Sequence, residues 1–551
     1  MTPIRGSGDR RSLGRPQRLP HDETAIAGSR YEGNKRMAWL LATTRMLGPN
    51  TRGLPRADFV APMRELGIRI DSSRISRWES GLEYLSPRLV AAYEQVAGLP
   101  PEHLGVVRRA VARDGQLMDR HAKKPEPPDP VRIDEILDRV DAGEVHGHEW
   151  LWLADQLHAY DNVYLPRRTW ESLATHLVDE LARAATTPYL ARYEATVTLL
   201  NARQAQPHLT KSVGRFVLDP DAAVITPVLA VLSEMSDPAA CDLVLRLLQS
   251  PSGKLRNSAA IVAAAMIGRE HLDPDDHVIE VHVGHELKAA AGVPSSVTLD
   301  LASRLTDARF ERVLHATTDE AARAALRQAR ANHELIDPEE ARTLADHIGM
   351  HAELLSSRKS PDPDQMLRRL VREALCHVHR RRRHLAAAML LASPYAHSVA
   401  EVALGLTAHD DERLANLCWS LVGRMASALS AHALAEQLLT ERRPRLRTRA
   451  ASTLMWVTDT LPEDAVEVLA RAAVDTSETQ QTASAAVLAL GLAGRTDRLA
   501  DIADAMPRQV GALAQWAIER GPAVKDQNHA GPLVTPTEPQ PNRDRTAPDW
   551  R

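Results

Sequence analysis

A short segment at residues 71–81 combines hydroxyl and guanidinium side chains at helical spacing. At 100° per residue, Ile75 and Trp78 fall on one apolar stripe, and Asp71 or the serine after it can cap the start of the helix. Hydroxyl and guanidinium groups can hydrogen-bond to base edges in the DNA major groove. The polar side of this helix carries Ser72, Ser73, Arg74, Ser76 and Arg77. Taken alone, the segment is also compatible with an ordinary surface helix. The neighbouring elements decide between this interpretation and a DNA-reading helix.

The flanking sequence predicts four more short helices around this segment. They cover residues 34–47, 55–66 and 88 to about 97, and a last helix begins near Pro101 and continues through Val107. Gly81 supplies the left-handed residue that ends the central helix. The elements together predict a five-helix unit with the polar segment as its third helix.

The run ISRWESG at residues 75–81, with Leu66 and Gly67 before it and residues 89–94 after it, resembles the Cro/C1-type helix-turn-helix family. These proteins are also called xenobiotic-response-element-type regulators. The resemblance covers about residues 34–108 and implies a five-helix DNA-binding domain whose third helix reads bases. It implies base contacts for Ser72, Ser73 and Arg77, with Arg74 and Ser76 at flanking positions that reach bases or phosphates.

Other arginines are predicted to contact DNA phosphates, where they would add affinity without sequence preference. These are Arg45, Arg56, Arg69 and Arg88, and the resemblance places Arg56 where family members often carry a phosphate-binding glutamine. The span between two glycines, Gly53 and Gly67, is longer than the family pattern and contains Pro62, which departs from a regular helix interior. Trp78 is expected in the core, and Glu79 is expected to orient a neighbouring arginine or the backbone.

Composition places the chain among all-α proteins with two or more domains. It has 551 residues, only 4% of them aromatic, and helical runs rich in alanine and leucine recur along it. Residues 1–120 carry 20 Lys and Arg against 13 Asp and Glu, while the rest carries 48 against 59. A basic N-terminal part and an acidic remainder are typical of a DNA-binding domain joined to a body that does not bind DNA.

The sequence predicts a cytoplasmic, nucleoid-associated protein with no membrane contact. Its three cysteines lie far apart, and it has neither a signal peptide nor an apolar run of 18 residues.

Composition shifts divide the chain into six parts. These are a disordered basic arm at 1–33, the helix-turn-helix domain at 34–118, a Pro-rich linker at 119–130, a helical, aromatic-rich segment at 131–218, HEAT-like repeats at 219–520 and a disordered tail at 521–551. The aromatic cluster of the fourth part is expected to form core rather than a contact surface.

The repeat region shows helices rich in small residues that begin 34 residues apart, at Leu414, Thr448 and Thr482. Looser copies occur at 384–392 and 255–268. A fixed period predicts an α-solenoid of helical hairpins, each burying its apolar side on its neighbour.

Two basic runs, Arg380 to Arg383 and the arginines between Arg442 and Arg449, allow two interpretations. They are either a second phosphate-contacting ridge or solvated turns neutralised by Asp410, Asp411 and Glu441, and the second is preferred.

The predicted function is a sequence-specific DNA-binding transcriptional regulator of bacterial type that binds double-stranded DNA as a homodimer. The helical body would supply dimerisation or a site for a peptide, small-molecule or protein effector. No catalytic residue, metal site or cofactor is predicted, because the histidines at 271–285 match no metal motif and no nucleotide-binding loop is present. The main alternative is a helical-repeat scaffold whose N-terminal unit binds DNA non-specifically or not at all. A more distant alternative is an enzyme within residues 131–380.

Overall fold

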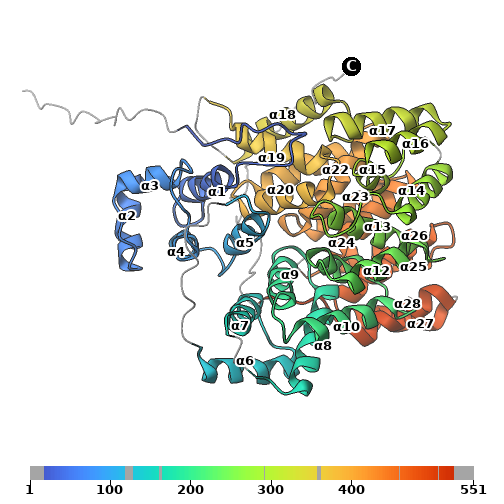
Figure 1. Ribbon diagram of the computed structural model, residues 1–551, viewed down its shortest axis with the longest axis horizontal. Coiled ribbons are helices and arrows are strands. Elements are labelled where there is room, and N and C mark those ends of the chain that lie inside the picture. Colours follow the sequence, from blue (N-terminus) through green and yellow to red (C-terminus); the bar gives the residue numbers. More distant parts are fainter. Residues whose placement is uncertain are drawn as a thin grey trace, which may run out of the picture.

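The computed structural model describes residues 18–117, 128–160, 164–290, 292–356, 362–457, 460–506 and 508–526. Within these ranges every extended regular element is a helix, and the one isolated β-bridge pairs Glu334 with His377. The predicted all-α class is confirmed. Figure 1 shows the helices in chain order, with the first five at one edge of the molecule.

The N-terminal unit contains the five predicted helices. Their bounds are α1 Gly33–Leu47, α2 Arg56–Glu65, α3 Ser72–Trp78, α4 Pro87–Ala97 and α5 Gly105–Arg113. The second helix continues through Pro62, and the fifth begins later than the predicted start near Pro101 because a turn occupies residues 101–104. Ser86 caps α4 through its side chain, and Gly98 ends that helix with a φ of 71°.

The aromatic-rich segment forms five helices. They are α6 Pro130–Ala142, α7 Gly147–Ala159, α8 Arg167–Arg183, α9 Thr186–Leu200 and α10 Gln206–Leu218. Trp150, Trp170 and Tyr193 are buried, as expected for core residues, whereas Tyr164 is exposed. The segment packs continuously against the helices that follow, since α10 contacts α11 and α9 contacts η1.

The remaining helices form the repeat body. They are α11 Thr226–Leu229, η1 Ala230–Glu234, α12 Pro238–Leu248, α13 Gly253–Ile267, α14 His277–Ala289, α15 Ser296–Ala302, α16 Asp307–Ala316, α17 Glu320–Asn332, α18 Pro338–Leu355, α19 Gln365–Cys376, α20 Arg380–Ala392, α21 Ala396–Gly405, η2 Leu406–Ala408, α22 Glu412–Arg424, η3 Ala426–Ala428, α23 Ala431–Thr440, α24 Pro444–Leu454, α25 Glu463–Val474, α26 Gln480–Leu492, α27 Thr496–Ala505 and α28 Arg508–Arg520.

The predicted repeat helices stack on one another. Contacts join α22 to α24, α24 to α26 and α26 to α28, which is the order that the 34-residue spacing predicts. Thr448 and Thr482, at equivalent positions of two successive repeats, approach to 2.8 Å through their hydroxyl oxygens. Small residues on these helices permit the close packing, because alanine adds little bulk between neighbouring helix axes.

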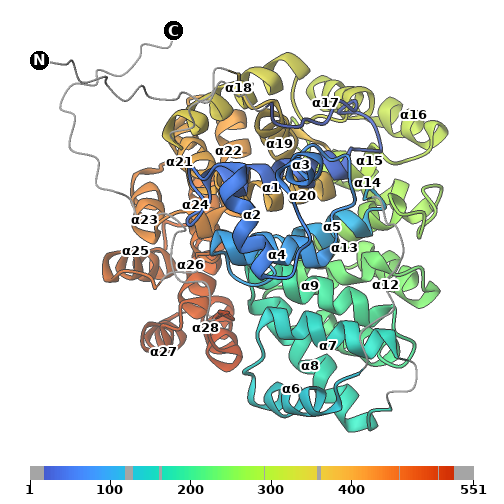
Figure 2. The same cartoon turned by 90° about the vertical axis from the view of Figure 1, so that its left-hand side faces the viewer.

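The end of the repeat body returns to the aromatic-rich segment, so the helices from α7 to α28 follow a closed circuit (Figure 2). Arg520 of α28 pairs with Asp179 of α8 at 3.2 Å, and the Val524 amide donates to the Arg183 carbonyl at 3.2 Å. Asp526 accepts from the Gly147 amide at 2.9 Å and pairs with buried Arg192 at 3.1 Å. The prediction of a disordered tail from residue 521 is therefore wrong for 521–526. The rest of the tail lies outside the described residues.

Candidate nucleic-acid interface

The N-terminal unit is fixed to the body by a buried ion-pair network at α1. Arg36 donates to Glu373 of α19 at 2.6 and 2.8 Å and to Asp22 at 2.7 Å, and all three side chains have 0% exposure. Burial alone would raise the pKa of Glu373, but Arg36, Arg382 and Arg369 hold it well below its usual range. Because residues 18–33 pack here, the predicted arm is not disordered over that stretch, and residues 1–17 lie outside the described part.

Further contacts on α1 and α5 hold the same unit. Trp39 of α1 donates its indole N–H to Asp364 at 3.0 Å and stacks on Tyr395 with ring centroids 6.2 Å apart. On α5, Arg109 pairs with Asp155 of α7 at 2.7 Å, and Arg113 pairs with Glu194 of α9 at 2.8 Å. The body therefore fixes α1 and α5, while α2 and α3 lie at the outer edge of the molecule (Figure 1).

The third helix forms through local signals that the sequence carries. Asp71 caps it by accepting from the Arg74 amide at 2.8 Å, and Ile75 and Trp78 are buried beneath it, as predicted. Gly81 has a φ of 76°, and a Cβ at this position would lie 3.1 Å from the Lys35 Cα. This turn therefore requires glycine both for its backbone angle and for its close approach to α1.

The five residues predicted to read bases lie together on the outer side of α3. Ser72, Ser73, Arg74 and Arg77 are exposed and Ser76 is half-buried. The Ser73 hydroxyl donates to Asp71 at 2.7 Å. The structure leaves this face open to solvent, and its contact with bases stays a prediction.

Glu83 is a member of this face that the sequence analysis missed. It pairs with Arg77 at 2.9 Å and with Arg74 at 3.4 Å, so one carboxylate positions both guanidinium groups. The sequence carries a signal for this role of Glu83, because the predicted turn at Gly81 brings the chain back past the end of α3. A carboxylate here orients the arginines and also competes with a phosphate or base for them.

The four predicted phosphate contacts are not equivalent. Arg69 and Arg88 are exposed, and Arg88 donates weakly to the carbonyls of Leu66 and Gly67 at 3.4 and 3.3 Å. Arg56 is 31% exposed and pairs with Glu79 at 3.3 Å. Arg45 is only 4% exposed and pairs with Glu79 at 2.6 Å, so the prediction that it contacts a phosphate is wrong.

Glu79 organises the core behind the reading face. It is buried, and it accepts hydrogen bonds from Arg45 and Arg56 and from the Tyr93 hydroxyl at 3.4 Å. The expectation that Glu79 orients a neighbouring arginine is confirmed. Burial and then the Glu79 charge raise the pKa of Tyr93 well above its usual value, so its hydroxyl stays protonated and can donate.

The preferred interpretation of the two basic runs, as solvated turns, does not hold for the whole of the first run. Arg382 and Arg383 are buried, Arg382 pairs with Glu373 at 3.1 Å, and Arg381 contacts Asp114 of the N-terminal unit. The expected neutralisation by Glu441 occurs for Arg443, at 2.8 Å. The first run therefore faces the interior because α20 packs against α5 and α19.

Three histidines that the sequence analysis did not group, His333, His377 and His379, place ring nitrogens within 4.8 Å of one another. His377 uses both of its ring nitrogens, because Nδ1 accepts from the His379 amide at 3.0 Å and Nε2 faces the Ile26 carbonyl at 3.2 Å. Burial is the largest cause that lowers the pKa of His377 to about 3; Glu373 opposes the shift, and the charges of Arg382 and Arg383 add to it. Charged arginines around these rings disfavour a cation, so the group is best explained as packing.

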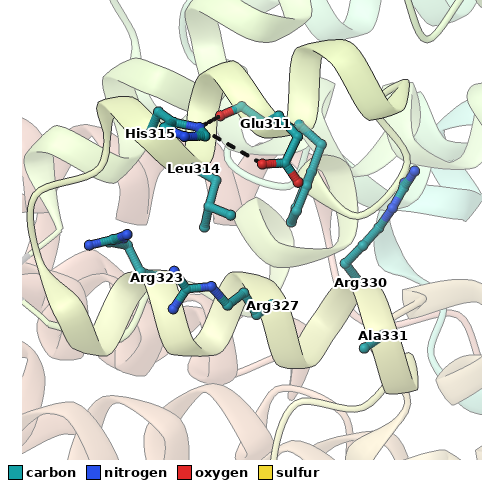
Figure 3. Close-up of a pocket in the computed structure, with 8 residues that line it drawn as sticks. Glu311, Leu314, His315, Arg323, Arg327, Arg330 and Ala331 are labelled. Atoms are coloured by element: carbon teal, nitrogen blue, oxygen red, sulfur yellow. Dashed lines mark hydrogen bonds and ion pairs between the residues drawn. The ribbon is translucent and has the colours of Figure 1, made fainter.

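A pocket of about 440 Å³ lies between α16 and α17 (Figure 3). Phe310, Leu314 and His315 form one wall, and Arg323 and Arg327 from α17 point toward the opening from the other. Both arginines pair with Glu320, at 3.1 and 3.4 Å, and that carboxylate is 72% exposed. Exposed pairs of this kind are weak, so the two guanidinium groups are available to an acidic ligand.

Within the described residues no helix is both long enough and apolar enough to cross a membrane. No protein-family model matches the sequence, and no curated protein matches it.

Solved structures that match the chain include one from work on tubulin recruitment and assembly by microtubule polymerases with Tumor Overexpressed Gene (TOG) domain arrays. It shares 12% identity, the match covers 76% of this chain and 98% of that one, and the TM-score is 0.21. At this TM-score the similarity supports no conclusion about partners. Over its described residues the chain is all-helical, with a helical-repeat body.

Proposed function

We propose that this chain binds double-stranded DNA through α2 and α3, reads bases with α3, and regulates transcription. The observation that supports the proposal is the capped, solvent-facing α3, whose hydroxyl and guanidinium groups point away from a unit anchored at α1 and α5. A recognition helix needs this arrangement, because its polar face must enter the major groove while its apolar face is held by a rigid support.

The distribution of charge around α3 agrees with this role. Arg69 precedes the helix and Arg88 lies on α4, and both are exposed where they can reach phosphates on either side of a groove. Arg77 is 63% exposed, so its guanidinium can leave Glu83 for guanine O6 and N7 at small cost. One short helix reads only a few base pairs, so we expect two copies of the chain on adjacent half-sites.

The test is equilibrium binding of the full chain to duplexes selected from a random pool. Arg77→Ala should weaken binding to the selected duplex by roughly 1–3 kcal/mol and relax the preference at one base pair. Arg445→Ala is the matched control, because Arg445 is an exposed arginine on the distant helix α24. Equal affinity of the wild-type chain for selected and scrambled duplexes at moderate salt would refute the proposal.

A second candidate is a helical-repeat scaffold that binds a protein partner, and the pocket between α16 and α17 favours it. Arg323 and Arg327 face a partly apolar opening, which suits a short acidic segment with a hydrophobic residue. A glutamate-rich peptide that binds the wild-type chain and fails to bind Arg323→Gln/Arg327→Gln would support it. For either function we propose no catalytic step.

A further inference from the structure

The pocket between α16 and α17 has a mixed lining (Figure 3). Phe310, Leu314 and Ala331 supply its apolar part, and three arginines and one carboxylate, Glu311, supply the charged part. Its volume of about 440 Å³ lies within the range of about 300–1,000 Å³ that is typical of small-molecule pockets. Such pockets combine apolar walls with a few placed polar groups, so this one suits an organic molecule with an apolar part and a negative charge.

One of the three arginines is committed to the fold. Arg330 donates to the carbonyls of Ser303 and Leu305 at 2.6 and 2.9 Å, and it also contacts Asp307. Its guanidinium lies 5.4 Å from the centre of the Phe310 ring. These contacts hold the end of α17 against α16, so Arg330 shapes the pocket and leaves the binding of an anion to the other two arginines.

Arg323 and Arg327 keep unused hydrogen-bond donors. Both pair with one carboxylate, that of Glu320, at 3.1 and 3.4 Å, and Glu320 is 72% exposed. The Nε of Arg323 is buried and has no hydrogen-bond partner among the described residues. A guanidinium carries five N–H donors and binds a carboxylate best through two parallel hydrogen bonds. Glu320 thus shows that a single carboxylate can reach both arginines, and an exposed pair of this kind is weak enough to be replaced.

The surface around the pocket favours a small ligand over a protein segment. All large apolar side chains of α16 and α17 are buried, namely Phe310, Val313, Leu314 and Leu326. A stable protein interface typically buries about 1,200–2,000 Å² around an apolar centre. Since neither helix exposes a large apolar side chain beyond the pocket, such a centre has nothing to extend over, and the pocket itself is the apolar site.

We propose that this pocket binds a small organic acid with an aromatic group. The carboxylate of the acid replaces Glu320 on Arg323 and Arg327. Its aromatic ring packs against Leu314, and flat guanidinium groups can stack on such a ring. The inference rests on the pocket of the second candidate function, and it commits to a free small molecule in place of a protein segment.

The test measures binding of phenylbutyrate to the full chain by titration calorimetry. Butyrate lacks the ring and phenylbutanamide lacks the charge, so both should bind more weakly than phenylbutyrate. Arg323→Gln/Arg327→Gln should weaken binding by about tenfold or more, as expected when hydrogen bonds to a charged group are lost. Arg342→Gln should bind like wild type. It is the matched control, because Arg342 is an exposed arginine of α18 that pairs with Glu339 three residues earlier, as Arg323 pairs with Glu320.

Glu320→Gln gives a readout in the opposite direction. This substitution removes the competing carboxylate and keeps the shape of the side chain, so it should strengthen phenylbutyrate binding up to about fivefold. A gain in affinity cannot come from a misfolded variant. Weaker binding to Glu320→Gln would overturn the claim that the ligand takes the place of Glu320.

Two further results overturn the proposal. The first is that phenylbutyrate binds the wild-type chain no more tightly than butyrate does. The second is that Arg323→Gln/Arg327→Gln and Arg342→Gln bind it equally well. A glutamate-rich peptide is measured in parallel. Peptide binding without phenylbutyrate binding would overturn this inference and support the second candidate function, whereas phenylbutyrate binding without peptide binding would support the inference and refute that candidate.

Discussion

The substitution Glu373→Gln tests how the N-terminal unit is held on the body. Glu373 is fully buried and accepts hydrogen bonds from Arg36, Arg369 and Arg382 at 2.6 to 3.1 Å. Glutamine keeps the shape but removes the charge, and its amide N–H groups would face guanidinium donors. Breaking a buried ion pair from one side costs about 3–5 kcal/mol. We expect about 3 kcal/mol, because Arg36 retains Asp22 at 2.6 Å.

The assay is urea unfolding together with hydrogen exchange of the α1 amides. The urea midpoint should fall for Glu373→Gln, and exchange in α1 should accelerate more than exchange in the distant helix α26. Glu320→Gln is the matched control, because Glu320 is 72% exposed and its pairs contribute at most about 1 kcal/mol. A Glu373→Gln variant as stable as this control, with unchanged exchange in α1, would refute the reasoning.

Three further predictions concern charge. Arg69→Ala and Arg88→Ala should each lower affinity similarly for all duplexes and reduce the log–log salt slope by about 1, whereas a loss confined to one sequence would contradict a phosphate role. Glu83→Gln should tighten DNA binding up to about fivefold in titrations, because it removes exposed ion pairs with Arg74 and Arg77 that contribute at most about 1 kcal/mol. Weaker binding of this variant would show that Glu83 acts only by orienting the two arginines. Because the pKa of Glu373 is lowered by folding, its stabilisation is present at neutral pH and lost as pH falls below its unfolded value of about 4.3. Urea midpoints of wild type and Glu373→Gln should therefore converge below about pH 4, and a constant difference down to pH 3 would be inconsistent with this.

The N-terminal unit was largely predictable from sequence because its signals are local. The Asp71 cap, the buried pair Ile75 and Trp78, and the Gly81 turn all lie within eleven residues and need no tertiary information. The 34-residue repeat was predictable for the same reason, since the Thr448 and Thr482 contact follows directly from the period.

Contacts between distant segments were not predictable from a single sequence. Arg45 and Glu79 are 34 residues apart, and Arg36 and Glu373 are 337 apart, so nothing local shows that these charges meet in the core. A run such as Arg380 to Arg383 is typical of solvated turns, and only the packing of α20 against α5 and α19 turns it inward. The closure through Asp526 depends likewise on helices more than 300 residues away.

The central claim is that the solvent-facing side of α3 recognises DNA sequence, and selection from a pool of random duplexes by the full chain tests it most directly. Wild type should enrich one motif, with two half-sites if the chain dimerises, and Arg74→Ala/Arg77→Ala should enrich none. Failure of the wild-type chain to enrich any motif, or enrichment of the same motif by the double variant, would contradict the claim.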